Sequence, residues 1–122
     1  MNDPDRRFPR ALYRQGREPD ARFSLANERT FLAWIRTSLA LLAGGVALEA
    51  LGLSLQPDLR LAASLVLIGA GIVTPVQAWW GWRRTEAALR HDQPLPSAVL
   101  ALPIGVAVLA AGVLVALGVI LA

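Results

Sequence analysis

Hydrophobic residues in this chain gather into three long stretches, and polar residues gather between them. The stretch 37–55 has 19 positions with a single charged residue, Glu49, whereas 61–82 and 97–122 contain no charged residue. A helix needs about 20 apolar residues to cross the hydrocarbon core of a bilayer. Strands of membrane barrels are shorter and alternate between polar and apolar positions, unlike these stretches. The pattern therefore predicts three membrane-spanning helices, with spans of approximately 31–55, 61–82 and 97–122.

The polar segments divide the chain into an N-terminal arm and a membrane domain. Residues 1–21 are rich in arginine, aspartate and proline, which is typical of a segment that is disordered or loosely attached to a membrane surface. Residues 22–122 form the predicted membrane domain. Ser24 is a suitable N-cap for a short amphipathic helix that begins near Leu25 and leads into the first span. The predicted fold class is all-α, an integral-membrane three-helix bundle with a polar arm.

Two polar connections separate the three predicted spans. Residues 56–58 read as a short turn, and residues 83–96 form a longer connection that ends in two prolines. Pro75 lies inside the second span, where proline is tolerated in membrane helices and usually kinks them. The sequence therefore predicts helices joined in simple alternation across the bilayer.

Composition supports a membrane protein and removes several kinds of chemistry. Of 122 residues, 55% are hydrophobic and 17% are charged, whereas a soluble domain of this size needs a more polar surface. There is no cysteine, so disulfides, thiolate metal sites and cysteine nucleophiles are excluded. His91 has no partner ligands nearby in sequence, and no phosphate-binding loop, nucleophile elbow or pair of catalytic carboxylates occurs. We therefore expect no enzymatic activity, cofactor or metal.

Arginine is distributed unevenly between the polar segments. All 12 basic residues are arginine; eight lie in residues 1–36, Arg60 lies in the first connection, and three lie in the second. Basic residues mark cytoplasmic loops, which predicts a cytoplasmic N-terminus and a C-terminus on the outside. Indoles favour the headgroup layer, and all four tryptophans fall at the cytoplasmic ends of the first two spans: Trp34, Trp79, Trp80 and Trp82. The net charge of +3 then reflects topology, and we expect no nucleic-acid partner.

A distinctive run of residues precedes the first apolar stretch. Residues 23–37 read FSLANERTFLAWIRT, and this run resembles the signature of the YidH family of small bacterial inner-membrane proteins. A similar Ala-Asn-Glu-Arg-Thr-Phe-Leu-x-Trp run occurs in the membrane domain of the fungal vacuolar transporter chaperone complex. We refer below to six positions of the run as the signature residues: Asn27, Glu28, Arg29, Thr30, Trp34 and Arg36.

The resemblance implies a multi-pass protein of the bacterial inner membrane, in a family with three membrane helices and no settled function. In the fungal complex the related domain forms an oligomer that passes polyphosphate across a membrane, with basic residues of its first helix along the path. This chain lacks the polymerase and phosphate-sensing domains of that complex, so we expect no polyphosphate synthesis. Arg36 matches the bacterial form of the motif rather than the fungal one.

Arg29 and Arg36 are the candidate anion-binding residues. They are seven positions apart, and seven residues of an α-helix turn by about 700°, so both lie on nearly the same face. Two interpretations remain open: the stripe is an anion-binding entrance, or its arginines reach lipid phosphates or pair with nearby carboxylates. Small residues, which allow close helix approach, continue the same face at Ala40, Ala43 and Ala47.

Glu49 is the candidate polar site within the membrane. It lies six positions before the predicted end of the first span, so about 9 Å inside that end at 1.5 Å per residue. Charged groups at such depth are costly and usually face protein or water. Gly45 and Gly52 share its face. Glu49 is therefore either a proton or cation site or a neutral carboxyl that is hydrogen-bonded between helices.

Small residues also bear on assembly and function. Glycine occurs in all three spans on more faces than a three-helix bundle needs, which predicts a homo-oligomer. The first functional hypothesis is an oligomeric channel or transporter component for an anion such as phosphate or polyphosphate. The alternative is a non-transporting scaffold or accessory subunit that binds a partner protein or anionic lipid through the basic arm. A third hypothesis is a proton-linked carrier centred on Glu49.

Overall fold

The protein is described by a computed structural model that covers residues 7–97 and 101–122. Within these residues a short helix, α1 (Arg10–Tyr13), precedes three long ones, α2 (Ala21–Ala50), α3 (Pro57–Arg90) and α4 (Ala101–Ile120). The three long helices are all long and apolar enough to cross a membrane, and the described residues contain no strand. The prediction of an all-α fold with three membrane-length helices is therefore confirmed.

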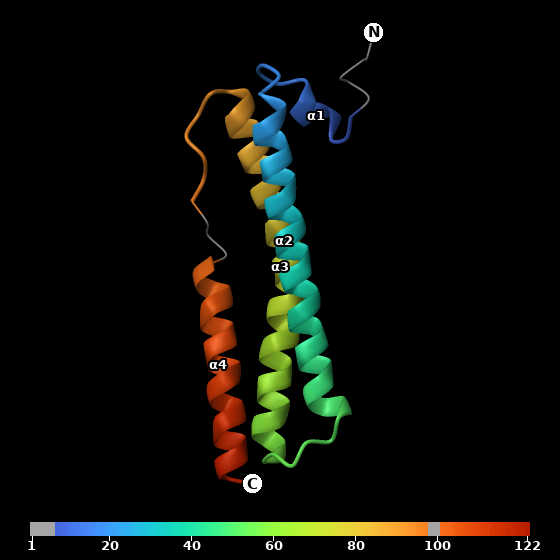
Figure 1. The fold of residues 1–122 in the computed structure, drawn as a ribbon, viewed down its shortest axis with the longest axis vertical. Coiled ribbons are helices and arrows are strands. Elements are labelled where there is room, and N and C mark those ends of the chain that lie inside the picture. The colour runs from blue at the N-terminus through green and yellow to red at the C-terminus, as the bar shows by residue number, and fades with distance from the viewer. Residues whose placement is uncertain (1–6, 98–100) are drawn as a thin grey trace.

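The long helices lie side by side, with α2 and α3 as a closely packed antiparallel pair (Figure 1). Helix α3 packs against both α2 and α4, whereas no Cα atoms of α2 and α4 approach within 8 Å of each other in the described residues. Helix α1, the start of α2 and the end of α3 lie together at what we call the arm end (Figure 1). The α2–α3 connection and the end of α4 lie at the opposite end, which we call the turn end.

Helix α4 is shorter than its neighbours and lies beside their turn-end portions (Figure 1). The backbone N–H of Gln56 donates to the Gly118 carbonyl at 3.0 Å, which fixes the last turn of α4 beside the start of α3. The 20 residues of α4 extend about 30 Å, the thickness of the hydrocarbon core. Ala101 lies 17 residues before Gly118 in α4, and Gly118 lies beside Leu59 of α3. The same number of residues along the antiparallel α3, counted from Leu59, ends at Val76. If the described length of α4 is taken as the thickness of the apolar layer, the part of α3 beyond Val76 extends past that layer.

The first span ends earlier than predicted. Helix α2 stops at Ala50 rather than near residue 55, because Gly52 adopts a positive φ of 59°, a left-handed conformation that ends helices and favours glycine. Helix α3 then begins at Pro57, and the Gln56 side chain caps it by accepting from the N–H of Leu59 at 2.8 Å. Proline suits this first helical position since its missing N–H is not needed there. The predicted turn at 56–58 is thus largely the first turn of α3.

The other boundaries also differ from the prediction. Helix α2 begins at Ala21 because Asp20, not Ser24, is its N-cap and accepts from the N–H of Arg22 at 2.9 Å. Helix α3 continues through Pro75 to Arg90, so the first half of the predicted connection 83–96 is helical. The predicted third span began at residue 97, which is not helical, while residues 98–100 lie outside the described part of the chain.

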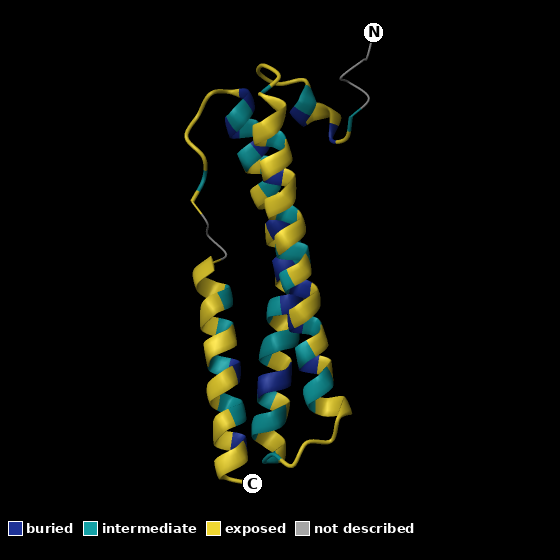
Figure 2. Ribbon diagram, viewed as in Figure 1, coloured by how far each residue is buried: buried dark blue, intermediate teal, exposed yellow. Residues whose placement is uncertain are grey.

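The core of the membrane domain lies between α2 and α3, while α4 is mostly exposed (Figure 2). Glycines allow the two helices to approach closely. A Cβ atom added to Gly45 would lie 2.9 Å from the carbonyl oxygen of Ser64, and one added to Gly71 would lie 2.7 Å from the Leu42 side chain. Across this interface Ser38 Oγ donates to the Gly71 carbonyl and Ser64 Oγ donates to the Gly45 carbonyl, each at 2.6 Å.

The described part of the arm is folded against the end of α3, contrary to the prediction of a disordered or loosely attached segment. Leu12 of α1 is only 1% exposed, and the Phe8 ring stacks on Trp79 with 6.1 Å between ring centroids. The N–H of Arg17 donates to the Arg90 carbonyl at 2.8 Å. Apolar contacts and backbone hydrogen bonds therefore compensate for the loss of chain entropy in this polar segment. Residues 1–6 lie outside the described part.

Candidate functional site

The signature residue Asn27 joins α2 to the arm-end portion of α3. Its side chain is 7% exposed, and Nδ2 donates to the Trp82 carbonyl at 3.0 Å and to Glu86 Oε1 at 3.4 Å. Ser24 lies one turn earlier on the same face of α2, and its hydroxyl donates to Glu86 Oε2 at 3.0 Å. Both oxygens of Glu86, which is 2% exposed, are therefore satisfied by α2, as a buried carboxylate requires.

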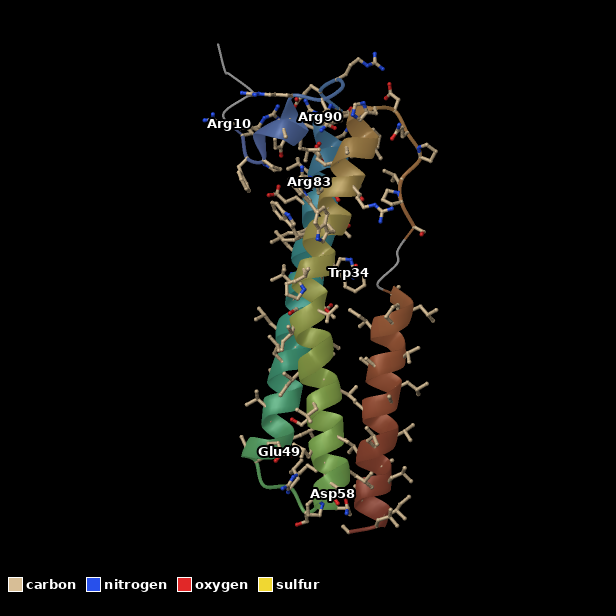
Figure 3. The ribbon with its side chains drawn as sticks, turned by 180° about the vertical axis from the view of Figure 1, so that it is seen from behind. Arg10, Trp34, Glu49, Asp58, Arg83 and Arg90 are labelled. Carbon is tan, nitrogen blue, oxygen red and sulfur yellow. The ribbon has the colours of Figure 1, made fainter. Side chains whose placement is uncertain are left out.

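Arg90 holds the arm against the membrane domain (Figure 3). Its side chain is 4% exposed. Nε donates to the Gln15 carbonyl at 2.8 Å and Nη2 donates to the Tyr13 carbonyl at 2.7 Å, while Nη1 binds Glu18 Oε2 at 3.1 Å. The fixed fork of guanidinium donors matches three acceptors in one short loop, which an ammonium group could not do equally well.

Glu18 is the acidic partner in this arm cluster. Both of its carboxylate oxygens also accept from Arg7, at 2.7 and 2.8 Å. The hydrogen bonds from Arg7 lower the pKa of Glu18 from 4.5 to about 2, with a further contribution from Arg90 and an opposing effect of partial burial. Glu18 therefore stays anionic well below neutral pH.

Arg29 and Arg36, the predicted anion-binding residues, both lie on the exposed surface of α2. The residues of α2 that face α3 are buried, among them Asn27 and Ser38. Arg29 is two residues past Asn27 and Arg36 two before Ser38, so each is turned by about 200° from the α3-facing side. Neither arginine makes an ion pair or hydrogen bond with its side chain within the described part of the chain. Glu28 is exposed beside them.

The remaining signature side chains, Thr30 and Trp34, line a pocket at the arm end. Thr30 Oγ1 donates to the Ala26 carbonyl at 3.1 Å, and Trp34 lies on the side of the α2–α3 pair that faces α4 (Figure 3). The pocket has a volume of about 210 Å³ and is lined by α2, α3 and two residues that follow α3, Pro96 and Ser97. Sequence reasoning missed it because its walls come from three separate segments.

Glu49 is not deep within the first span, as the sequence suggested, because α2 ends one residue later at Ala50. Its Oε1 lies 3.4 Å from Nε of Arg60, and the Glu49 side chain is 40% exposed. Arg60 Nη1 also donates to the Leu53 carbonyl at 2.9 Å. The glutamate thus belongs to an ion pair at the turn end, where it joins α2, the connection and α3 (Figure 3).

The prediction that residues 83–96 form a connection between two spans missed two buried groups. Glu86 and Arg90 are the buried ones, and the hydrogen-bond partners of their side chains lie 59 to 77 positions away. His91 is exposed beside Gln15, with Nε2 3.2 Å from Oε1. The run 83–90 has alanine, leucine, glutamate and arginine, which all favour a helix; this was the available signal that α3 continues.

Three membrane-length helices, a folded polar arm and a basic outer face define a small multi-span helical membrane protein. The chain belongs to the YidH family, since it matches the domain of unknown function DUF202 over residues 22–88. It is 47% identical over 88 residues to the inner membrane protein YidH of Escherichia coli K12, covering 70% of this chain and 75% of that protein. No solved structure matches it. The family and the three apolar helices assign it to the inner membrane.

Another relative is a mycobacterial protein. The chain is 48% identical over 80 residues to the uncharacterized protein Rv2272 of Mycobacterium tuberculosis H37Rv, covering 65% of this chain and 66% of that protein. The expected relation to the fungal membrane domain stays a prediction. The predicted membership of a bacterial inner-membrane family is confirmed.

Proposed function

We propose that this protein is a homo-oligomeric anion-conducting protein of the inner membrane, with phosphate or polyphosphate as its anion and its arm end in the cytoplasm. The observation that carries the proposal is the basic outer face of α2. Arg29 and Arg36 share that face, and no carboxylate pairs with either within the described residues. Two guanidinium groups that have no carboxylate partner and lie on one face of a helix attract and bind phosphate oxygens.

The depth of Arg36 supports a role beyond contact with the membrane surface. Ser38 is hydrogen-bonded to Gly71, which lies five residues on the turn side of Val76, where the apolar layer defined by α4 ends. Arg36 thus lies inside that layer by roughly one helical turn, about 5 Å. Intramembrane charges usually face protein or a water-filled cavity. Snorkelling to lipid phosphates is the competing explanation, and it predicts no conductance.

The arrangement of helices favours a path between protomers rather than within one. No Cα atoms of α2 and α4 lie within 8 Å of each other in the described chain, so the helices of a single copy do not form a closed ring around a channel. The face of α2 that carries the arginines continues into Ala40 and Ala43, which are both exposed. Small side chains allow other helices to approach closely. Several copies arranged with α2 innermost would bring their Arg36 residues around a common axis.

The test is a comparison of single-channel currents in planar bilayers, with chloride, phosphate and short polyphosphate as the anions. Arg36→Ala should lower the anion conductance several-fold. Arg83→Ala is the matched control, because Arg83 also lacks a partner in the described residues but lies on α3. A silent bilayer that contains correctly inserted oligomers, or equal losses in the two variants, would exclude the conducting role.

A second candidate is a scaffold or accessory subunit, favoured by the ordered arm. Because the arm is anchored through Arg90, its exposed residue Arg10 has a defined position and can contribute to a specific protein interface. In this case Arg10→Glu should abolish co-purification of a defined membrane partner. Under the conducting hypothesis the same substitution leaves the anion selectivity of the current unchanged.

A further inference from the structure

The pocket at the arm end is separate from the basic outer face of α2. Its volume of about 210 Å³ lies between α2, the region of α3 around Trp80 and Trp82, and Ser97 before α4. Asn27, Thr30 and Trp34 line it from the α3-facing side of α2, opposite to the side that carries Arg29 and Arg36. Ligand binding in this pocket is therefore independent of whether the protein conducts anions.

The polar groups of the pocket favour a negatively charged ligand. Among the described residues that line it, Arg84 is the only charged one, and none is a carboxylate. Arg84, Thr85 and Ser97 make no side-chain hydrogen bond or ion pair within the described residues. The indole N–H groups of the lining tryptophans are donors only. A pocket with a guanidinium, free hydroxyls and no acid is suited to the oxygens of a phosphate group.

The position of the pocket favours a lipid as the source of that phosphate. Its walls on α3 begin at Gln77, directly beyond Val76, where the apolar layer that α4 defines comes to an end. This is the depth of phospholipid headgroups, and tryptophan side chains prefer it because one end is apolar and the other polar. The volume is smaller than that of pockets for drug-sized molecules, so it accommodates part of a headgroup rather than a whole lipid.

We propose that this pocket binds the phosphate group of an anionic phospholipid from the leaflet at the arm end. Arg84 and the hydroxyl of Thr85 bind the phosphate oxygens, and Trp34 and Trp80 contact the glycerol and the first part of an acyl chain. Such a lipid would contact α2, α3 and the segment before α4 at once, and so link α4 to the other helices at the arm end.

Native mass spectrometry of the full chain in detergent tests the proposal with three added probes. Phosphatidylglycerol carries both phosphate and acyl chains, dioleoylglycerol lacks the phosphate, and glycerol 3-phosphate lacks the chains. Only phosphatidylglycerol should be retained. Arg84→Gln should weaken its retention about tenfold, the effect of losing a charge-assisted hydrogen bond. Arg83→Gln, which removes the neighbouring arginine outside the pocket, should leave retention within about twofold.

A second pair of variants tests the pocket without changing its charge. Gly81 lines the pocket, and a Cβ atom added there meets no atom within 4 Å, so Gly81→Leu should fill space and weaken retention of phosphatidylglycerol. Gly69 is equally open but is not part of the pocket, so Gly69→Leu should have no effect. Equal losses in Arg83→Gln and Arg84→Gln, undiminished retention in Gly81→Leu, or equal binding of glycerol 3-phosphate or dioleoylglycerol would each overturn the proposal.

Discussion

The α2–α3 pair is held together by different chemistry at its arm end and in its membrane half, by which we mean the portion on the turn side of Val76. In the membrane half the two helices meet through glycine and serine, with hydrogen bonds from Ser38 and Ser64 to glycine carbonyls. At the arm end they meet through Asn27, which donates to the Trp82 carbonyl and to Glu86, while Arg90 of α3 binds the backbone of the arm. The same pair of helices thus changes its packing chemistry along its length.

The difference follows from the two solvents that the protein contacts. Within lipid there is no hydrophobic force between helices, because the acyl chains are as apolar as the side chains, so close van der Waals packing stabilises the pair. Beyond Val76, where α3 extends past the described part of α4, we expect water and headgroups to surround the helices. There a buried carboxylate or guanidinium is stable only when protein partners replace its water, and both Glu86 and Arg90 have such partners.

In the membrane half, the substitution that we expect to destabilise the helix pair most is at Gly45. In Gly45→Ala the new methyl group would lie 2.6 Å from the Ile68 side chain and 2.9 Å from the Ser64 carbonyl oxygen. Because a backbone atom must move, we expect the free energy of unfolding to fall by about 2–3 kcal/mol, the usual cost of overpacking. The measurement is an unfolding titration in mixed micelles with an increasing fraction of denaturing detergent.

Gly44→Ala is the matched control for this prediction. The added methyl group at Gly44 would meet Leu67 Cδ1 at an ordinary distance of 3.6 Å, so the substitution should be neutral or stabilise the helix by up to about 1 kcal/mol. Equal destabilisation by both substitutions would show that helix approach at Gly45 does not govern the stability of this interface.

At the arm end, we expect the contacts of the arm to depend on Arg90. Arg90→Ala leaves the carbonyls of Tyr13 and Gln15 without a donor, and we expect the arm to detach at a cost of about 1–3 kcal/mol, the range for buried groups that lose their partner. Hydrogen–deuterium exchange should speed up in residues 10–20, while residues 38–45 of the membrane half stay protected. Arg90→Lys should give an intermediate result because an ammonium group lacks the fork of donors.

Arg83→Ala serves as the control for Arg90→Ala. Arg83 also lies near the end of α3 but does not bind the arm within the described residues. Its replacement should leave exchange in residues 10–20 unchanged. Faster exchange throughout the chain in Arg90→Ala would contradict the separation of the two halves.

The sequence predicts the membrane half better than the arm end, and the reason is physical. A membrane span can be recognised from a local property, the absence of charge over about 20 residues. Helical periodicity alone assigns Arg29 and Arg36 to one face. The ends of the helices depend on single residues such as Asp20 and Gly52, whose capping roles compete with neighbouring candidates. Glu49 was misjudged for that reason, since its depth was counted from a helix end that lies five residues too far.

The arm end escapes prediction because its interactions are between residues far apart in the chain. Nothing near Arg90 in sequence indicates that its guanidinium binds the carbonyls of Tyr13 and Gln15. An arginine-rich arm has the composition of a disordered segment, and only the tertiary contacts of Leu12 and Phe8 reverse that expectation. The pocket has the same origin, since its walls come from three segments.

Docking of the arm should depend on pH, whereas packing in the membrane half should not. The Arg7 hydrogen bonds, assisted by Arg90, lower the pKa of Glu18 from 4.5 to about 2 in the folded arm. A depressed carboxyl pKa contributes stability that is fully present above the unfolded value of 4.5 and is lost as pH falls through the folded value.

Docking of the arm should therefore weaken between about pH 4.5 and pH 2 and stay constant from pH 5 to 8. The van der Waals contacts and neutral serine hydrogen bonds of the membrane half have no such dependence. Exchange of the Arg17 N–H, which donates to the Arg90 carbonyl at 2.8 Å, reports the change once it is corrected for the intrinsic pH dependence of exchange. In Glu18→Gln the profile should be flat over the same range; an unchanged acid-dependent profile in that variant would assign the effect to another carboxylate.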